Sequence, residues 1–347
     1  MKKSLLHTFK EILAKNLPFV IFRHPNSKEV NLLWQKTNDL VEFNDFSQSG
    51  YVFAPFDDKE TAYILEPHSI LKETLETKAL FQEEGYFDEL LEDKLQHVQL
   101  VSNAVDYINK SNVSKVVISR KEELELLSFD TFDTYIKMLS KYPNAYVYLW
   151  NHPKVGRWFG ATPETLITVK EKVFKTMALA GTMSFNGNLN PIWGAKELEE
   201  QQMVTDFIKS NLQNKVEVLN FDKVETVKAG NLLHLKTNVF GELTNSNSLK
   251  KIVNLLHPTP AVCGLPKVES KDYILNNEGY HRSYYTGYLG ELNIDKKTAL
   301  YVNLRCFELV NSKAYIYIGG GVTAASNPLL EWEETVSKSK TIKNIIS

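Results

Sequence analysis

The C-terminal segment from Ile318 to Lys340 places three consecutive glycines before a helix start that is rich in glutamate. Pro328 suits the first position of that helix. Glu331 and Glu334 are three residues apart and therefore share one helix face, and Lys338 lies four residues beyond Glu334. A helix that binds phosphate at its N-terminus would not carry acidic side chains in its first turns. These glutamates therefore bind a cation or form a solvated, salt-bridged surface.

A second acidic group lies in the mid-chain stretch KELEEQQMVTDF, which has the periodicity of an amphipathic helix. Glu200 falls on the side of the apolar residues Val204 and Phe207, whereas Glu199 points more outward. A carboxylate on a buried face is costly unless it is paired or binds a metal. One carboxylate from each of two helices would suit Mg²⁺, which accepts few protein carboxylates and takes water or ligand oxygens as its other ligands. The alternative is that Glu200 lies at the solvated start of its helix.

Two strand-like segments each carry a cation that could act on a ligand. In SKVVISR, Lys115 shares a strand face with Val117 and Ser119. An inward lysine loses its proton more readily and can become a base, but its ammonium can also extend to water from a strand end. In LYVNLRCFEL, Arg305 shares a face with Asn303 and suits bidentate binding of a carboxylate. A surface position for Arg305 is the equal alternative.

Two further polar residues occur in turns that contain proline. Glu164 follows a proline in GATPETL, at a turn into a strand, and His257 opens the rigid loop HPTPAVCGLP. A lone histidine is more often structural than catalytic. The chain contains no phosphate-binding loop, dinucleotide fingerprint, zinc cluster or Ser-His-Asp arrangement.

The bulk composition limits the kind of protein that carries these residues. The chain has 347 residues, of which 43% are hydrophobic and 24% charged, as in soluble proteins with a sizeable core. A formal net charge of −2 provides no basic field for nucleic acid. Two cysteines, Cys263 and Cys306, fit a reducing compartment, and no stretch approaches a signal peptide or a membrane span. We therefore expect a cytoplasmic protein that binds neither nucleic acid nor membrane.

Strand-like segments dominate the chain, with helices interspersed among them. The patterns predict helical structure over about 70–110 and over 131–143, a hairpin over 164–181 that turns at residues 170–172, and one strand through 299–310. Hairpins favour antiparallel pairing, so these elements predict an α+β fold and not a regular βαβ array. The absence of repeats and linkers favours one continuous domain.

Eight segments, in order, resemble motifs of the chorismate-utilising enzymes and, within that family, the isochorismate synthases. They are SKVVISRK, FGATPETL, MALAGTM, ELEEQQMV, HPTPAVCGLP, YYTGYLGEL, VNLRCFEL and IGGGVTAASNPLLEWEETVSK. The resemblance covers about residues 90–347, whereas residues 1–90 match loosely, chiefly through GYVFAPF. It implies a single domain over residues 1–347, in which two large antiparallel sheets pack together with helices outside.

The resemblance also implies a metal site and a substrate site. Glu200 and Glu334, with Glu331 close by, match the family's Mg²⁺ ligands, and the metal holds the ring carboxylate of chorismate. Arg305 matches the arginine that binds the enolpyruvyl carboxylate. Glycines before the last helix bring backbone N–H groups against the ligand, where side chains would block the approach. The substrate-binding positions implied in addition are Thr182, His257, Gly287, Gly319, Gly320, Gly321 and Lys338.

Within the family, the residue at position 115 distinguishes the nucleophile. Members that use ammonia commonly have Gln there, whereas isochorismate synthases have Lys as the general base for water. Ala180 stands where aminodeoxychorismate synthases carry a nucleophilic lysine. The resemblance therefore implies that Lys115 removes a proton from the water that attacks C2, while Glu164 protonates the departing C4 hydroxyl. Both pKa values should then be shifted toward neutrality.

Several alternatives remain open at this stage. A salicylate synthase would carry the same lysine and then eliminate pyruvate, and an anthranilate-type synthase subunit is disfavoured by Lys115. The product could enter menaquinone or siderophore synthesis. The chain has EEQ where the family often has HEH, so that Glu199 adds an acid next to Glu200. We expect a monomer that acts without a glutaminase subunit.

Overall fold

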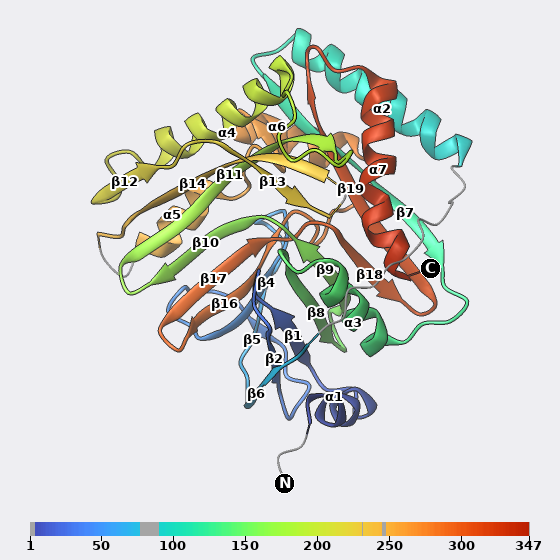
Figure 1. Ribbon diagram of the computed structural model, residues 1–347, viewed down its shortest axis with the longest axis vertical. Coiled ribbons are helices and arrows are strands. Elements are labelled where there is room, and N and C mark those ends of the chain that lie inside the picture. The colour runs from blue at the N-terminus through green and yellow to red at the C-terminus, as the bar shows by residue number, and fades with distance from the viewer. Residues whose placement is uncertain (1–3, 77–89, 231, 245–247, 347) are drawn as a thin grey trace.

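Residues 4–76, 90–230, 232–244 and 248–346 are described by the computed structural model, and their strands form two antiparallel sheets (Figure 1). The first sheet runs through β15 (Gly264–Leu265), β7 (Lys115–Glu125), β19 (Lys313–Thr323), β18 (Cys306–Val310), β9 (Gly156–Thr162), β8 (Tyr146–His152), β1 (Phe19–Arg23), β2 (Glu29–Trp34) and β6 (Ser69–Thr74). The second runs through β12 (Val218–Phe221), β14 (Leu232–Glu242), β11 (Val173–Ser184), β10 (Thr165–Lys170), β17 (Lys297–Val302), β16 (Tyr288–Ile294), β4 (Gly50–Ala54), β5 (Tyr63–Leu65) and β3 (Val41–Glu42), with β13 (Glu225–Ala229) beside β14.

The two sheets pack face to face through aromatic side chains. The ring of Phe53 on β4 stacks on Trp150 of β8 at 4.8 Å, and Tyr146 of β8 stacks on Tyr301 of β17 at 3.9 Å. Large flat side chains fill the space between the sheets and contribute stacking in addition to their buried area. The interior of the molecule is thus formed by alternate residues of strands that are distant in sequence.

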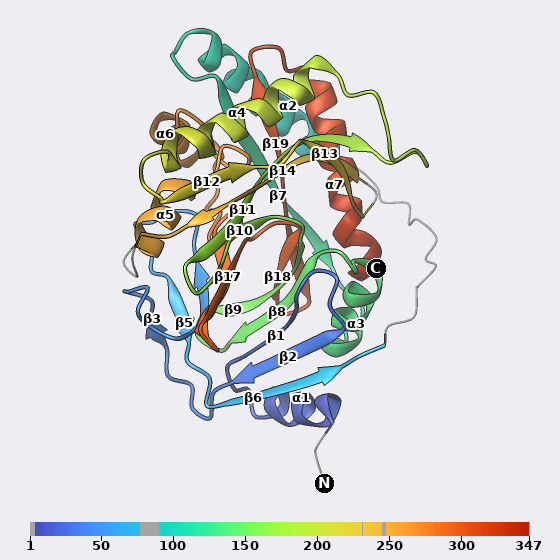
Figure 2. The same ribbon diagram turned by 60° about the vertical axis from the view of Figure 1, so that its left-hand side comes forward.

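Helices cover the outer faces of the sheets (Figure 2). α4 (Ala195–Leu212) and α5 (Ser248–Leu256) pack on the second sheet. The first sheet is covered by α1 (Leu5–Ala14), α3 (Thr131–Lys141) and α7 (Pro328–Ile346), and its β7 edge by α2 (Leu91–Asn109) and α6 (Lys267–Asn277). The predicted α+β fold of two packed antiparallel sheets with helices outside is therefore confirmed.

Two of the points at which the chain passes from one sheet to the other lie side by side. β9 ends in the first sheet and β10 begins in the second, with Glu164 between them. β17 belongs to the second sheet and β18 to the first, with Arg305 between them. The backbone N–H of Val302 donates to the carbonyl of Glu164 at 3.1 Å, and that of Ala161 donates to the carbonyl of Arg305 at 3.1 Å. These hydrogen bonds hold the two crossovers side by side.

The prediction of a single strand through 299–310 is wrong because of the second crossover. Arg305 has a φ of 49°, which breaks the alternation of side chains on which the predicted strand faces depended. Asn303 stabilises the change of direction, since its side chain accepts from the Tyr148 hydroxyl at 2.6 Å and donates to the Tyr284 carbonyl at 2.8 Å. Residues on either side are extended, but they belong to different sheets.

The N-terminal part, which resembles the family only loosely, completes both sheets. It supplies β1, β2 and β6 to the first sheet and β3, β4 and β5 to the second. The helix predicted over 70–110 is wrong at residues 69–74, because backbone pairing with β2 holds this segment as an edge strand. α2 confirms the helical prediction from residue 91, and residues 77–89 lie outside the described residues. The hairpin of β10 and β11 and helix α3 are also confirmed.

Candidate active site

A cavity of about 110 Å³ lies beside the two crossovers and is walled by both sheets, α4 and α7. Nine of the residues singled out from the sequence line it: Glu164, Thr182, Glu200, Arg305, Gly319, Gly320, Gly321, Glu334 and Lys338. They come from β11, β19, both helices and the crossovers, so only the packing of the sheets brings them together. Their roles toward a substrate stay predictions.

Lys115 and Glu200 form an ion pair between β7 and α4. The Lys115 Nζ lies 2.6 Å from Glu200 Oε1, and the lysine side chain is completely buried. A Cβ at Gly321 would lie 2.7 Å from Lys115 Cε and 2.8 Å from Glu200 Oε1, so this pair needs a glycine on β19. Burial alone raises the pKa of Glu200, but the positive charges around it, chiefly that of Lys115, lower the pKa below its ordinary value.

Two of the three glutamates of helix α7 are each paired with a lysine: Glu334 lines the cavity, whereas Glu331 is buried and does not line it. Glu334 lies 2.7 Å from Lys338, and the Lys338 ammonium also donates to the Gly319 carbonyl at 2.9 Å. Glu331 is paired with Lys196 of α4 at 2.7 Å. Burial and the neighbouring Glu334 raise the pKa of Glu331. The spacing-based prediction that Glu331 and Glu334 lie on the same side of the helix agrees with this arrangement.

Glu200, Glu331 and Glu334 together have the chemistry of a cation site. A Cβ at Gly320 would lie 3.3 Å from Glu331 Oε2 and 3.7 Å from Glu334 Oε1. Glu331 Oε2 is buried and has no hydrogen-bond partner within the described residues. As the side chains stand, no three acidic, histidine or cysteine groups of the described chain form a ready metal site, and each of the three carboxylates is paired with a lysine. The carboxylates fit a divalent cation, which would neutralise the negative charge that the lysines now neutralise.

Glu164 is the one carboxyl group of the cavity wall that faces no paired lysine among the described salt bridges. Its side chain is 3% exposed, and its Oε1 accepts from the Thr259 hydroxyl at 3.3 Å. Burial raises its pKa to about 7, although Thr259 and the charge of Lys115 oppose the increase. A carboxyl group in this setting holds its proton up to neutral pH and can donate it to a leaving group.

Arg305 is held by a histidine that the sequence reasoning did not single out. Its Nη2 lies 2.6 Å from His234 Nε2, and its Nη1 donates to the Ala229 carbonyl at 2.9 Å. His234 Nδ1 lies 2.9 Å from the carbonyl oxygen of Gly181. A histidine on an otherwise apolar strand, between Leu233 and Leu235, is the sequence signal that could have revealed this contact.

Two predicted substrate-binding positions lie one layer behind the cavity wall. His257 Nε2 is 3.0 Å from the carbonyl of Thr286, a residue that lines the cavity, and its ring packs edge-on against Tyr288. A Cβ at Gly287 would lie 2.0 Å from the Ala54 carbonyl oxygen, so the glycine allows β4 to pass closely. Both residues therefore shape the wall through Thr286. Burial lowers the pKa of His257 to about 4.

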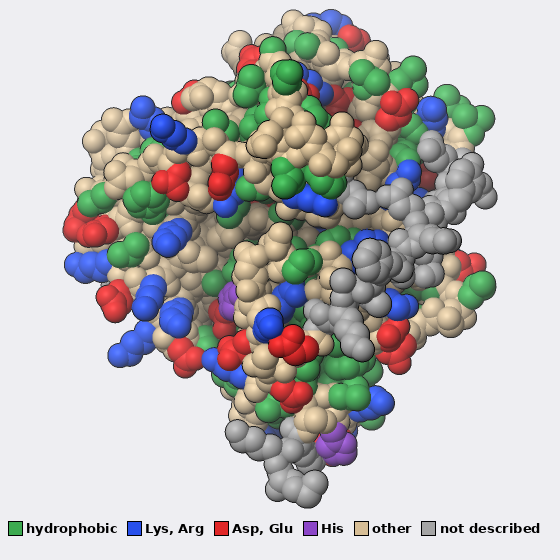
Figure 3. Space-filling model, in the orientation of Figure 1, with side chains coloured by type: hydrophobic (Ala, Val, Ile, Leu, Met, Phe, Trp, Pro, Cys, Tyr) green, Lys and Arg blue, Asp and Glu red, His purple; other side chains and the backbone are tan. Residues whose placement is uncertain are grey.

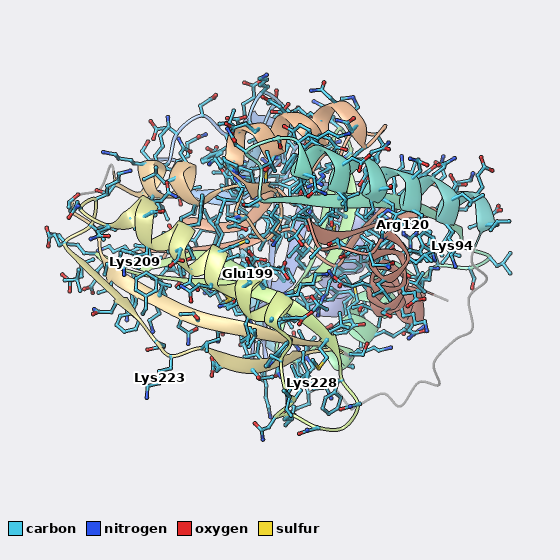
Figure 4. All side chains as sticks on the ribbon, turned by 90° about the horizontal axis from the view of Figure 1, so that it is seen from above. Lys94, Arg120, Glu199, Lys209, Lys223 and Lys228 are labelled. Atoms are coloured by element: carbon cyan, nitrogen blue, oxygen red, sulfur yellow. The ribbon has the colours of Figure 1, made fainter. Side chains whose placement is uncertain are left out.

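A larger hollow of about 1100 Å³ adjoins the cavity and shares with it Pro163, Leu179 and Arg305. Its described lining contains no aspartate or glutamate, and its other basic residues are Lys141, Lys228, Lys236 and Lys340. Figure 4 shows Lys228 on the β13 side of the molecule, where its ammonium lies 3.7 Å from the ring of Phe185. The approach to Arg305 is therefore basic, which favours an anionic ligand.

The rest of the surface has no comparable bias on the face drawn in Figure 3, where basic and acidic side chains are interspersed. This mixture is in keeping with the net charge of −2. None of the helices in the described ranges is both long and apolar enough to cross a membrane.

The fold and the cavity define a chorismate binding enzyme. Residues 57–347 match the family of that description, and the chain belongs to it. Among curated proteins, the chain is 27% identical over 269 residues to the salicylate biosynthesis isochorismate synthase of Pseudomonas aeruginosa. This match covers 75% of the chain and 56% of the relative. The chain is 27% identical over 248 residues to isochorismate synthase MenF of Haemophilus influenzae, covering 69% of this chain and 57% of the relative. The matches thus span little more than half of these relatives.

Solved structures show the same fold. A Bacillus anthracis protein, DhbC, described as a 2,3-dihydroxybenzoate-specific isochorismate synthase, superposes with a TM-score of 0.80 at 22% identity, covering 97% of this chain and 98% of its own. Anthranilate synthase component I of Streptococcus pneumoniae superposes with a TM-score of 0.71 at 18% identity, covering 93% and 89%. Because both kinds of enzyme share the fold, the fold does not distinguish their nucleophiles, and the difference lies in the residues of the cavity.

Proposed function

We propose that this protein is an isochorismate synthase, which converts chorismate to isochorismate by attack of water at C2 and loss of the C4 hydroxyl. The observation that carries the proposal is a buried carboxyl group whose pKa is about 7, Glu164, together with a buried lysine whose charge acts on it, Lys115. Lys115 contacts Glu200, which lines the same cavity as Glu164. A water-in, water-out isomerisation requires an acid and a base that both act on the substrate.

The chain's own residues would divide the reaction between binding and proton transfer. Arg305 would bind one carboxylate of chorismate through its guanidinium fork, and the basic hollow next to it would attract the anion. Lys115, once neutral, would take the proton of the attacking water. Glu164 would give its proton to the departing C4 hydroxyl, which leaves as water. The exchange of one water for another leaves the composition of the substrate unchanged.

The metal site would be formed by Glu200 and Glu334, with Glu331 beside them. Bound there, Mg²⁺ would supply the positive charge that offsets the ring carboxylate and would disfavour the proton on Lys115. The glycines of β19 would leave room for the carboxylate against the backbone, since a side chain at Gly320 or Gly321 would meet the glutamates.

The names of the relatives support water as the nucleophile, because several similar curated proteins are isochorismate synthases. Their names connect this reaction with menaquinone-type MenF proteins and with vibriobactin. The lysine at position 115 and the small Ala180 support the same assignment over amination. We propose that the chain acts in the cytoplasm as a monomer, and that it needs no glutaminase subunit because it uses no ammonia.

The proposal is tested by following isochorismate by chromatography for the parent, Lys115→Gln and Glu164→Gln. Each variant should lose kcat by about 10²-fold or more, while chorismate affinity measured by calorimetry changes far less, because each removes a proton-transfer step. Lys313→Gln changes an exposed ion pair that does not line the cavity, so it is the matched control and should keep the parental rate. Near-parental isochorismate formation by Lys115→Gln would exclude this lysine as the base. Release of pyruvate from chorismate by the parent would instead identify a salicylate synthase.

A further inference from the structure

Arg305 is a half-buried cation that faces no carboxylate among the described residues. A guanidinium has five N–H groups, and within the described residues that of Arg305 donates to the Ala229 carbonyl and to a ring nitrogen of His234. Burial lowers the pKa of Arg305 to about 10. A partly desolvated charge that lacks an ionic partner costs free energy, and an anionic ligand bound beside it would offset that cost.

The proton arrangement of His234 follows from its nearest neighbours. Its Nδ1 lies 2.9 Å from the Gly181 carbonyl oxygen and 3.5 Å from the Thr182 hydroxyl. The carbonyl oxygen can only accept, so Nδ1 carries the proton and donates it to Gly181. Nε2 therefore has a free lone pair, and it accepts from Arg305 Nη2 at 2.6 Å. Burial and the adjacent charge of Arg305 lower the pKa of His234 to about 3, so the imidazole is neutral at any working pH.

We infer that His234 is a positioning residue, which holds the guanidinium of Arg305 in a fixed orientation while leaving its positive charge available to a carboxylate ligand. The inference rests on the proposed function, in which that carboxylate belongs to chorismate. A carboxylate at this position would hold the guanidinium more firmly but would neutralise it. An apolar side chain would preserve the charge and lose the orientation. A neutral acceptor meets both requirements.

Gly181 connects this contact with the metal side of the cavity. It has a φ of 69°, a conformation that glycine adopts without strain, and its carbonyl accepts from His234 while its N–H donates to Glu200 Oε2 at 3.2 Å. One residue therefore sets the position of both the imidazole behind Arg305 and the carboxylate beside Lys115. The two ends of the substrate would be held at a separation that the backbone of β11 determines.

The experiment compares three substitutions that separate orientation from charge. His234→Leu removes the acceptor, His234→Gln keeps an amide oxygen near the position of Nε2, and His234→Glu keeps the contact but adds a negative charge. The Kd for chorismate by calorimetry, KM and kcat, and the thermal unfolding temperature are measured for each. We expect KM and Kd to rise about 10-fold for His234→Leu, to recover most of that loss for His234→Gln, and to rise about 10²-fold for His234→Glu, with kcat changing less.

The unfolding temperature distinguishes positioning from a merely structural role. His234→Glu should be at least as stable as His234→Leu, because it forms an ion pair with Arg305, and yet bind chorismate more weakly. Parental affinity in His234→Glu, or affinities that follow stability across the series, would overturn the inference. His152→Leu changes another buried histidine that does not line the cavity, so it is the matched control and should keep KM within about twofold. If the parent binds chorismate but makes no isochorismate, the proposed activity is wrong. The role of His234 in holding Arg305 is then still decided by the same series of Kd values.

Discussion

Strand β7 contributes to two buried groups of charged residues that differ in how completely they are hydrogen-bonded. At one, which we term the Arg282 cluster (Ser119, Glu278 and Arg282), all five N–H groups of Arg282 have acceptors: the Glu278 carboxylate, the carbonyls of Val117 and Val262, and the Thr286 hydroxyl. At the other, only four residues away along β7, Lys115 pairs with Glu200 at the cavity.

The difference separates a group that stabilises the fold from a group that can receive a ligand. In the Arg282 cluster, Glu278 also accepts from the N–H and hydroxyl of Ser119, and both ionic side chains are almost fully buried. Burial lowers the pKa of Arg282, but Glu278 raises it by more, so the charge persists. At the cavity, Glu331 Oε2 has no partner within the described residues and Arg305 has no carboxylate there. A ligand bound in the cavity would supply the hydrogen-bond and ionic partners that these groups lack.

The largest expected effect is loss of the proposed turnover when a cavity carboxylate is removed. Glu200→Ala and Glu334→Ala should each reduce isochorismate formation below detection, and a chelator should do the same, because a divalent cation is needed to offset the substrate carboxylate. Circular dichroism should show an intact fold. Glu199→Ala and Glu333→Ala change the adjacent exposed glutamates of the same two helices and are the matched controls. Figure 4 labels Glu199 on α4. Full activity in excess chelator would contradict the metal site.

The second largest effect is expected when the Arg282 cluster is broken by substitution, and it should appear as a lower free energy of unfolding. Arg282→Met should lower the free energy of unfolding by about 3–5 kcal/mol, because it leaves Glu278 buried and unpaired. Denaturant unfolding measures the loss. The double variant Arg282→Met/Glu278→Leu should recover part of it, since no uncompensated charge remains. If the single variant is as stable as the parent, the cluster does not stabilise the fold and the contrast with the cavity fails.

The smallest expected effect is a pH dependence of the unfolding free energy that is linked to Glu164 at the cavity and absent from the Arg282 cluster. The folded-state pKa of Glu164, about 7, lies above the ordinary 4.5, so the stability linked to its proton is complete below about pH 4.5 and is lost as the pH rises through 7. The difference in unfolding free energy between the parent and Glu164→Gln should therefore change by about 3 kcal/mol between pH 4.5 and 8. Glu278→Gln, measured in the same way, controls for a carboxylate held in an ion pair. A difference that does not vary with pH would place the Glu164 pKa near its ordinary value.

Much of the local structure could be predicted because it depends on short-range periodicity. The three-residue spacing of Glu331 and Glu334 placed them on one side of α7, and the alternation in SKVVISR placed Lys115 and Ser119 on the same face of β7. The turn between β10 and β11 falls within the predicted residues. Family membership was also predicted, because eight ordered motifs are far more specific than any single residue pattern.

By itself, then, the sequence determined the helices and strands around the candidate site, the residue types that could act there and the family. The tertiary structure alone decided that 299–310 crosses between the sheets, which turns Arg305 toward the cavity and brings it to His234 on β14. It also decided that Lys115 meets Glu200, 85 positions away in the chain, instead of extending to water. Periodicity describes which side of an element a residue occupies. The sheet that a strand joins, and the side chain that it meets there, depend on the packing of the whole chain.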